Sequence, residues 1–197
     1  MPVLHLVAGP NGVGKSTLYE YLIAPRHPTL PFVSAQQYAA ERLQHIDDLD
    51  ERTLAAQTWT DERRQELLRE GTSFVSETVF SHPSRVALIA QARSLGYEVV
   101  LYALGLDEPR KLLQRISQRE REGGAPVASH KVLERYPRAL ENFRRATRLA
   151  DLMFLFDAVD AQHGGPRLIA SVVAGQMHLH TVLRPRWVDK VLGFAEG

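Results

Sequence analysis

The sequence has no cysteine among its 197 residues, which excludes a disulfide scaffold and a metal site built from thiolates. No apolar run approaches the roughly 18 residues that a membrane-spanning helix needs. The first residues also lack the charged segment and the small-residue cleavage site of a secretory signal. These absences predict a cytoplasmic protein with no membrane partner.

Internal repeats and low-complexity segments are absent as well. Hydrophobic residues make up 44% of the chain and charged residues 24%, which is typical of a globular domain and argues against disorder. A chain of this length can bury a substantial core and falls within the range of one domain. We therefore expect a single domain over residues 1–197, with a C-terminal extension over about 176–197.

Short apolar runs alternate with segments of helical spacing along the chain, and this order predicts an α/β fold with a parallel sheet covered by helices on both faces. The expected strands are 3–8, 31–34, 73–76, 98–106 and 152–157, with 168–173 as an edge strand or hairpin arm. The expected helices are 15–23, 35–71 with a break at the acids 47–51, 83–95, 109–122, 131–149 and 185–194. Pro137 should bend or restart the helix in which it lies.

The strongest signal is a phosphate-binding loop between the first expected strand and the first expected helix. The segment Gly9-Pro10-Asn11-Gly12-Val13-Gly14-Lys15-Ser16 fits the pattern G-x-x-x-x-G-K-[ST] without a mismatch, and Thr17 follows it. Glycines let the backbone N–H groups of such a loop wrap phosphates, and the helix N-terminus adds to the attraction. We expect Lys15 to place its charge against the β- and γ-phosphates of ATP, and the Ser16 hydroxyl to bind Mg²⁺.

Loops of this kind also occur in ABC transporter ATPases. Those proteins need a later Leu-Ser-Gly-Gly-Gln-type signature to complete the site across a dimer, and the sequence contains nothing that resembles it. At this length, a P-loop NTPase fold of the nucleotide kinase or shikimate kinase type is the better interpretation. The sequence therefore predicts an ATP-dependent small-molecule kinase.

A second acidic ligand is expected near the loop, because open α/β sheets bind ligands at the carboxyl ends of their strands. Glu77 comes directly after the expected strand 73–76 and is followed by Thr78. We expect Glu77 to bind Mg²⁺ through water or to accept a hydrogen bond from the substrate. Asp157, after the fifth strand, is a weaker candidate for the same region.

Positive charge is concentrated in residues 110–148, which hold eleven lysines and arginines against four acids although the net charge of the chain is only +1. Such a local field suits a polyanionic ligand such as a nucleotide. Arg115 and Arg119 lie four apart on one expected helix, and Arg135 and Arg138 lie three apart on the next, so each pair shares a face. The pairs flank two glycines, which is typical of a lid that closes over ATP. An exposed basic helix face is the alternative interpretation.

Taken in order, several of these segments resemble the zeta-toxin family of P-loop kinases. The segments are Ala8–Thr17, Phe32-Val33, Ser73–Ser84, Gly123-Gly124 and Arg135–Arg138, and the resemblance runs from Val3 to about Asp157. Zeta-like enzymes phosphorylate a sugar hydroxyl of nucleotides of the UDP-N-acetylglucosamine type and are usually held by an antitoxin. The resemblance thus implies a sugar-nucleotide substrate and an antitoxin partner.

The chain departs from the family pattern in two places. The family usually reads Asn-Ala-Asp after the second strand, where the Asp is the base for the substrate hydroxyl, but the matching residues here are Ser34-Ala35-Gln36. The family lid usually reads Gly-Gly-His-x-Val-Pro, whereas this chain has Gly-Gly-Ala-Pro-Val-Ala over residues 123–128. Gln36 can orient a hydroxyl but cannot take its proton at neutral pH. The acids that could replace the base are Asp47, Asp48 and Asp61.

Three functions fit these observations: a sugar-nucleotide kinase acting as a toxin, a kinase of a nucleoside or dinucleotide, and a nucleotide-binding module with little transfer activity. A nucleic-acid partner is not expected, because the basic segment has only Tyr136 and Phe143 for base stacking. The residues expected to act in catalysis are Lys15, Gln36, Glu77, Arg119 and Arg138, and Arg115 joins Arg119 in binding ATP.

Overall fold

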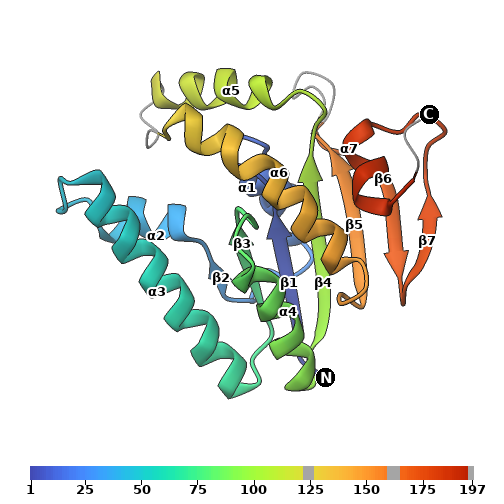
Figure 1. The fold of residues 1–197 in the computed structure, drawn as a ribbon. Helices are drawn as coiled ribbons and strands as arrows, with labels where there is room; N and C mark the ends of the chain where they lie inside the picture. Colours follow the sequence, from blue (N-terminus) through green and yellow to red (C-terminus); the bar gives the residue numbers. More distant parts are fainter. Residues whose placement is uncertain (122–126, 159–164, 195–197) are drawn as a thin grey trace.

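A sheet of seven strands forms the centre of the described part of the molecule, with helices on both of its sides (Figure 1). The computed structural model describes residues 1–121, 127–158 and 165–194. The strands are β1 (Val3–Ala8), β2 (Phe32–Val33), β3 (Phe74–Thr78), β4 (Glu98–Gly105), β5 (Leu152–Asp157), β6 (Arg167–Val173) and β7 (Gln176–Leu179), in the spatial order β2-β3-β1-β4-β5-β6-β7. The helices are α1 (Lys15–Leu18) with its π-helical continuation η1 (Tyr19–Ile23), α2 (Ala35–Arg42), α3 (Leu49–Glu70), α4 (Ser84–Ser94), α5 (Pro109–Arg121), α6 (Ser129–Ala146) and α7 (Arg186–Leu192).

Strand β1 lies between β3 and β4 and runs parallel to both. Its side chains alternate between two apolar clusters, because successive residues of a strand point to opposite faces. Leu4 and Leu6 pack in the cluster that includes side chains of α3, α4 and α7. Val7 packs in the cluster that includes side chains of α1, η1 and α5. The predicted α/β fold with helices on both faces is therefore confirmed.

The C-terminal part of the sheet is antiparallel, unlike the pairing of the other five strands. Strand β6 pairs antiparallel with β5 and with β7, so it is an interior strand and one arm of a hairpin rather than an edge. A parallel pair needs a crossover of a dozen or more residues, and the segments before and after β6 are too short for one. Strand β7 was not predicted, because all four of its residues are exposed and leave no buried apolar pattern.

Two helices also differ in detail from the expectation. The helix after the phosphate-binding loop passes from α1 into the π-helical turn η1. Helix α6 continues through Pro137 without restarting. Pro137 lies on the exposed side of α6, where water can pair with the carbonyl that loses its donor. The predicted hinge at Gly123-Gly124 lies outside the described residues.

Helix α7 closes the carboxyl end of β4 and β5. The Asp107 carboxylate accepts hydrogen bonds from the amides of Arg186 (3.0 Å) and Trp187 (2.8 Å). The Trp187 ring is 1% exposed, and its Nε1 donates to the Asp157 carboxylate at 3.1 Å. Helix α7, which falls within the expected C-terminal extension, is thus part of the core. No helix within the described ranges has the length and apolar character that crossing a membrane requires.

Gly105, at the end of β4, leaves the space that the Trp187 ring fills. A Cβ added there would lie 2.7 Å from Cδ2 of the ring. We expect Gly105→Ala to lower the free energy of unfolding by about 1–3 kcal/mol, as overpacked cores do. Urea unfolding measures the loss. Trp187→Phe makes the ring smaller, so the double variant should lose less than the sum of the two single losses. Additive losses would contradict this account.

Candidate active site

The phosphate-binding loop leaves the carboxyl end of β1 and leads directly into α1. The Gly9 amide donates to the Thr78 carbonyl at 3.1 Å, which extends the β1–β3 pairing into the loop. A Cβ on Gly9 would lie 2.7 Å from the Leu104 carbonyl oxygen, so the backbone can pass there only without a side chain. Gly12 (φ 79°) and Gly14 (φ 99°) adopt the left-handed conformation, which glycine reaches without strain. The loop is therefore shaped by its glycines, as the motif requires.

Lys15, Ser16 and Glu77 meet at this end of the sheet. Lys15 Nζ lies 3.7 Å from Glu77 Oε1 and donates to the Pro10 carbonyl at 3.2 Å. The Ser16 hydroxyl donates to Glu77 Oε2 at 3.1 Å. Burial lowers the pKa of Lys15, the nearby Glu77 carboxylate counteracts this, and the Arg119 charge lowers it further. The site thus holds a desolvated cation next to the loop that is predicted to bind phosphate.

Glu77 lies within β3, not after it as the sequence predicts. The strand continues to Thr78 because β1 pairs with it through Ala8 and Thr78. This places the Glu77 carboxylate among three polar groups, since Ser34 Oγ also donates to its Oε2 at 3.4 Å. Ser34 additionally caps α2 by accepting from the Gln37 amide at 3.4 Å. A serine before a helical pattern is the signal that would have identified it.

The donor set fits a bound Mg²⁺. This ion prefers oxygen ligands and is usually held by one or two protein groups together with substrate phosphates and water. The Ser16 hydroxyl and the Glu77 carboxylate are two such oxygen donors, 3.1 Å apart. Within the described ranges, no group of three or more His, Cys, Asp or Glu side chains could hold a metal.

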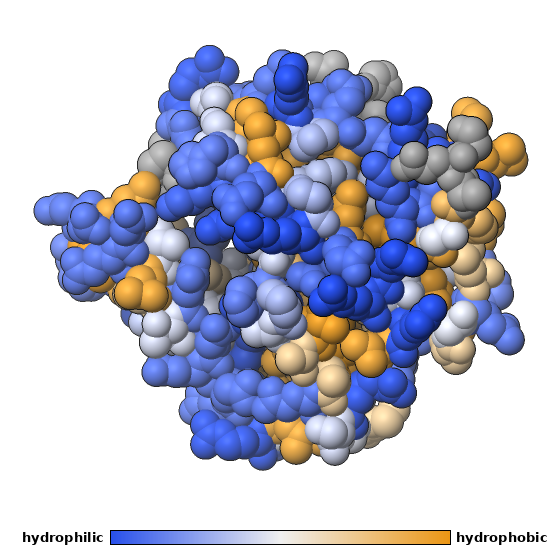
Figure 2. Space-filling view, in the orientation of Figure 1, coloured by the Kyte–Doolittle hydropathy of each residue, from blue (hydrophilic) through white to orange (hydrophobic). Residues whose placement is uncertain are grey.

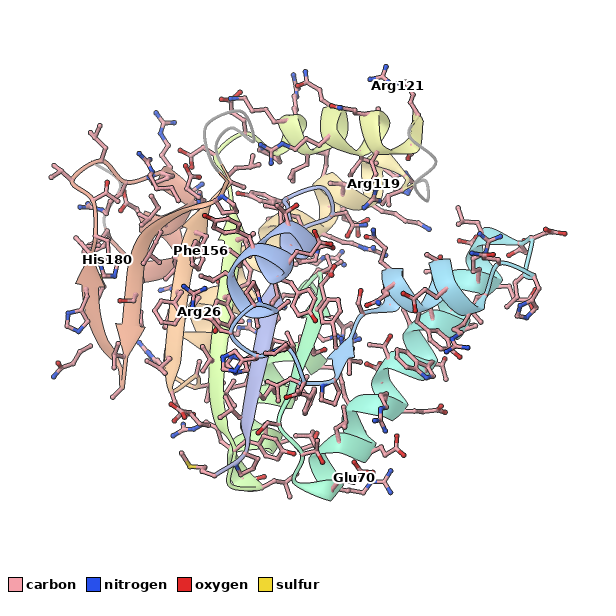
Figure 3. All side chains as sticks on the ribbon, turned by 180° about the vertical axis from the view of Figure 1, so that it is seen from behind. Arg26, Glu70, Arg119, Arg121, Phe156 and His180 are labelled. Atoms are coloured by element: carbon pink, nitrogen blue, oxygen red, sulfur yellow. The ribbon has the colours of Figure 1, made fainter. Side chains whose placement is uncertain are left out.

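Gln36 and Arg119 come together across the site. Gln36 is near the start of α2, and its Oε1 accepts a hydrogen bond from Arg119 Nη1 at 3.0 Å. Figure 3 shows Arg119 on the side of α5 that faces α1 and α2, opposite to Arg121. The structure therefore brings Arg119 into the charged cluster of Lys15 and Glu77.

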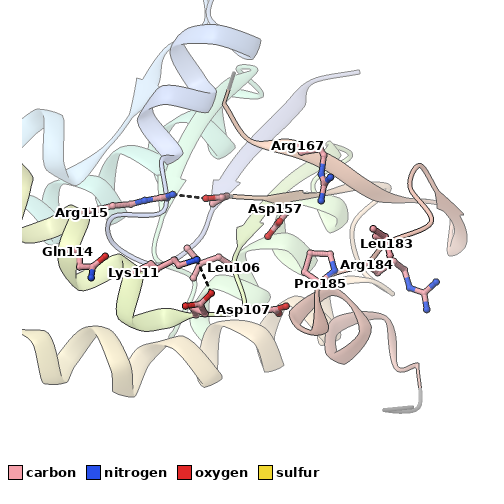
Figure 4. Close-up of a pocket in the computed structure, with 12 residues that line it drawn as sticks. Leu106, Asp107, Lys111, Gln114, Arg115, Asp157, Arg167, Leu183, Arg184 and Pro185 are labelled. Carbon is pink, nitrogen blue, oxygen red and sulfur yellow. Dashed lines mark hydrogen bonds and ion pairs between the residues drawn. The ribbon is translucent and has the colours of Figure 1, made fainter. Parts of the chain in front are cut away.

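Arg115 and Arg138 are placed elsewhere. Arg115 Nη2 donates to the Ala158 carbonyl at 2.7 Å (Figure 4). Arg138 forms an ion pair with Glu134 on the outer face of α6, and its side chain is 60% exposed. In this arrangement the i, i+4 partner on its own helix holds the Arg138 guanidinium outside the cluster of Lys15, Glu77 and Arg119, and its contact with ATP stays a prediction.

Two cavities lie on either side of this cluster. The α5–β6 cavity has a volume of about 560 Å³ and contains Arg115 and Asp157 among its lining residues (Figure 4). Burial raises the pKa of the Asp157 carboxyl, and the hydrogen bond from Trp187 opposes that rise. Asp157 thus lies in the wall of the α5–β6 cavity and not beside Glu77.

The α2–α3 cavity, of about 920 Å³, is lined by Ser16, Tyr19, Glu20, Phe32, Ser34, Gln36, Gln37, Tyr38, Ala40, Glu41, Arg42 and Trp59. Two stacked ring pairs contribute to its wall: Tyr19 with Phe32, at a centroid distance of 3.7 Å, and Tyr38 with Trp59, at 3.9 Å. The sequence carries no clear signal for these rings, because aromatic residues at helical spacing are usually core residues. Together they form flat apolar surface beside Ser16.

The acids considered as alternative bases do not line the α2–α3 cavity. Asp48 caps α3 by accepting from the Glu51 amide at 2.7 Å. Asp61 is held by Arg64 at 2.7 Å and by Arg85 at 2.5 Å. Asp47 is an exposed residue just before α3. Gln36, the residue at the predicted catalytic position, does line this cavity.

A model of the family described as AAA domain matches residues 4–143. A chain of the PezAT chromosomal toxin-antitoxin system of Streptococcus pneumoniae has a TM-score of 0.62 at 14% identity, with 80% of this chain and 68% of that chain covered. The AvrRxo1-ORF1:-ORF2 complex solved with ATP gives 0.67 at 17% identity, with 91% and 61% covered. The same pair solved with sulphate ions gives 0.66 at 17% identity, with 97% and 63% covered. No curated protein matches the chain.

These similarities confirm the P-loop kinase fold that the sequence predicts. The chain spans less than two thirds of the two AvrRxo1 chains, 61% and 63% of their length. At these identities the likeness is one of fold.

Arg119 and Arg138 form a matched pair for testing nucleotide contacts. We expect Arg119→Ala to weaken ATP binding by about 10–100-fold, because a hydrogen bond to a charged group contributes about 1.5–3 kcal/mol. Arg138→Ala should leave ATP binding unchanged, since an exposed ion pair contributes only about 0–1 kcal/mol. Calorimetric titration with ATP measures both variants. Equal weakening in both would instead indicate that α6 moves onto the nucleotide.

Proposed function

The chain belongs to the AAA domain family, and we propose that it transfers the γ-phosphate of ATP to a hydroxyl group of a small molecule. One observation carries this proposal: the polar cluster at the phosphate-binding loop and the α2–α3 cavity share a wall. Ser16, Ser34 and Gln36 line the cavity, and the Ser16 and Ser34 hydroxyls donate to the Glu77 carboxylate. An acceptor in the cavity therefore lies next to the groups that hold the phosphates.

The cations of the site supply most of what phosphoryl transfer needs from a protein, namely positioning and charge stabilisation. Lys15 is placed against the β- and γ-phosphates, and Arg119 meets the transferred group from α5. Ser16 and Glu77 would hold Mg²⁺, and the ion would supply positive charge to neutralise the phosphates. Before ATP binds, Lys15 is occupied by Glu77 and the Pro10 carbonyl. ATP binding exchanges these contacts for phosphate oxygens.

We place the nucleoside part of ATP in the α5–β6 cavity. Arg115 of α5 is one of the residues that line this cavity. Helix α5 also packs on the loop, since Leu112 and Ile116 share an apolar cluster with Val13. Residues 110–148 then act as the lid predicted from the sequence. Helix α5 contacts both parts of the nucleotide, the phosphates through Arg119 and the nucleoside through Arg115.

We propose a sugar nucleotide of the UDP-N-acetylglucosamine type as the acceptor, as the zeta-like segments imply. The aromatic wall of the α2–α3 cavity supports an acceptor with a flat base, because nucleobases stack on aromatic rings. The same wall suits a nucleoside or a dinucleotide, which is the alternative. A screen of ATP consumption against UDP-sugars, nucleosides and NAD, read by mass spectrometry, decides between them. If none of these compounds increases the consumption of ATP, both the sugar-nucleotide acceptor and its alternative are contradicted.

We also propose that the chain acts as the toxin of a toxin-antitoxin pair. The similar chains from the PezAT toxin-antitoxin system and from the two-protein AvrRxo1 complex support a protein partner. Expression without a partner should then arrest growth. The Lys15→Ala variant should restore growth, and co-expression of a neighbouring open reading frame is the way to find the antitoxin.

Lys15→Ala tests the phosphate site directly. We expect turnover to fall by at least about 100-fold, because a buried cation aimed at the transferred charge contributes several kcal/mol. The fold should persist, since the loop lies at the end of β1 and outside the two apolar clusters except for Val13. ADP release and thermal unfolding measure the two effects. Unchanged ADP release would overturn the assignment of the loop.

Gln36→Asp tests the proton transfer. Gln36 orients the acceptor hydroxyl, and Asp in its place would also accept the proton, a contribution that is typically about 10²–10⁴-fold. We expect turnover of the acceptor found in the screen to rise by at least about tenfold. The Arg119 contact should survive, because Asp also offers an acceptor oxygen. If turnover is unchanged or lower, the base lies elsewhere or Gln36 contacts a different substrate.

A further inference from the structure

Arg64 is a buried arginine on α3 that the proposed reaction does not use directly. Its side chain is 3% exposed. It donates from Nε to Ser76 Oγ at 2.7 Å, from Nη2 to the Glu77 carbonyl at 2.8 Å, and from Nη1 to Asp61 Oδ1 at 2.7 Å. Two of the three acceptors belong to the end of β3 that carries the Glu77 carboxylate. Burying a guanidinium is costly unless its donors are satisfied, and here all three directions are used.

The Glu77 carbonyl lies on the side of β3 that faces β2. The Val75 amide donates to the Pro31 carbonyl at 2.9 Å, so residue 75 uses its backbone groups toward β2, and residue 77 must do the same because strands alternate. Strand β2 ends at Val33, opposite Ser76. No strand residue is therefore available for the Glu77 carbonyl, and Arg64 takes the place of the missing strand.

Ser76 links the same arginine to the end of β2. Its hydroxyl accepts from Arg64 Nε and donates to the Val33 carbonyl at 3.3 Å. Val33 is followed by Ser34, which donates to the Glu77 carboxylate and caps α2. The chain of contacts from Arg64 thus reaches both sides of the Glu77 carboxylate: its own backbone, and the turn that supplies the Ser34 hydroxyl.

Asp61 holds the guanidinium from the outside. Asp61 also binds Arg85 of α4, so two helices fix the side chain. Burial lowers the pKa of Arg64 to about 10, and the side chain therefore stays charged at neutral pH. A planar guanidinium presents several donors in a fixed fork, which a lysine cannot reproduce.

We propose that Arg64 is a positioning residue, which replaces the missing end of β2 and thereby holds Glu77 and the Ser34 turn in place to receive Mg²⁺. The inference rests on the proposed function, because Glu77 is the carboxylate assigned there to the ion. It assigns to an α3 arginine the support that other sheet positions receive from a neighbouring strand.

Two measurements test this role: Mg²⁺-dependent binding of the ATP analogue AMP-PNP by calorimetry, and amide hydrogen exchange of residues 32–37 and 74–78 without nucleotide. In Arg64→Met, the gain in AMP-PNP affinity on adding Mg²⁺ should fall by about 10–100-fold, the usual effect of removing an outer partner of a metal ligand. Affinity without Mg²⁺ should stay the same, because Arg64 touches neither Lys15 nor the loop. Exchange in both segments should become faster.

Arg63→Met is the matched control, since Arg63 is the neighbouring residue on α3 and pairs with Glu66 on the surface. It should change neither measurement. Arg64→Lys keeps the charge but loses the fork, so it should lie between wild type and Arg64→Met. If Arg64→Met does not fold, Arg64→Lys carries the test.

The outcomes separate the two proposals. If the wild type gains no AMP-PNP affinity from Mg²⁺, the proposed function fails, and the role of Arg64 in receiving Mg²⁺ fails with it. If a folded Arg64 variant keeps both the Mg²⁺ gain and the slow exchange of the wild type, the positioning role is overturned while the proposed function stands.

Discussion

The parallel pairing of β1 with β3 is the constraint on which the site depends. Its register sets Val7 beside Glu77 and Ala8 beside Thr78, and the Gly9 amide continues the ladder at the Thr78 carbonyl. The phosphate-binding loop therefore begins level with the Glu77 carboxylate. Lys15 and Ser16, which follow within one turn of helix, then reach that carboxylate from α1. A shift of the register by one residue would turn Glu77 to the other face of the sheet and separate the two.

The charged side chains of the site are held by contacts with neighbouring polar groups. Lys15 is 8% exposed, and burial of its amine without a partner would be costly. Glu77 compensates this cost, and Arg119, held by Gln36, adds a second cation nearby. The face of the molecule in Figure 2 is mainly hydrophilic, with smaller apolar areas that include one in its lower centre and one at its upper right edge.

Local patterns in the sequence predict the parallel part of the sheet, the loop and the Lys15–Ser16–Glu77 cluster, because a motif and the strands beside it determine them. The hairpin of β6 and β7 is not predicted in full, since β7 buries none of its side chains. Spacing along one helix suggests that Arg115 and Arg119 act together, yet Arg115 reaches Ala158 and Arg119 reaches Gln36. The positioning role of Arg64 cannot be predicted from the sequence for the same reason. It depends on the residue at which β2 ends relative to β3, and only the tertiary structure shows this.

The contacts of α7 impose an order on the folding of the chain during its synthesis. Asp107 at the end of β4 can accept its hydrogen bond from the Trp187 amide only after that residue, 80 positions later in the chain, has been synthesised. The same holds for the Trp187 ring that fills the space at Gly105. Ribosomes add about 5–20 residues per second, so roughly 4–16 seconds separate the synthesis of these partners at that rate. During that interval the carboxyl ends of β4 and β5 lack their cover, and the wall of the α5–β6 cavity is unfinished. The wall of the α5–β6 cavity, which includes Arg115 and Arg184, is thus complete only after residues of both segments have been synthesised.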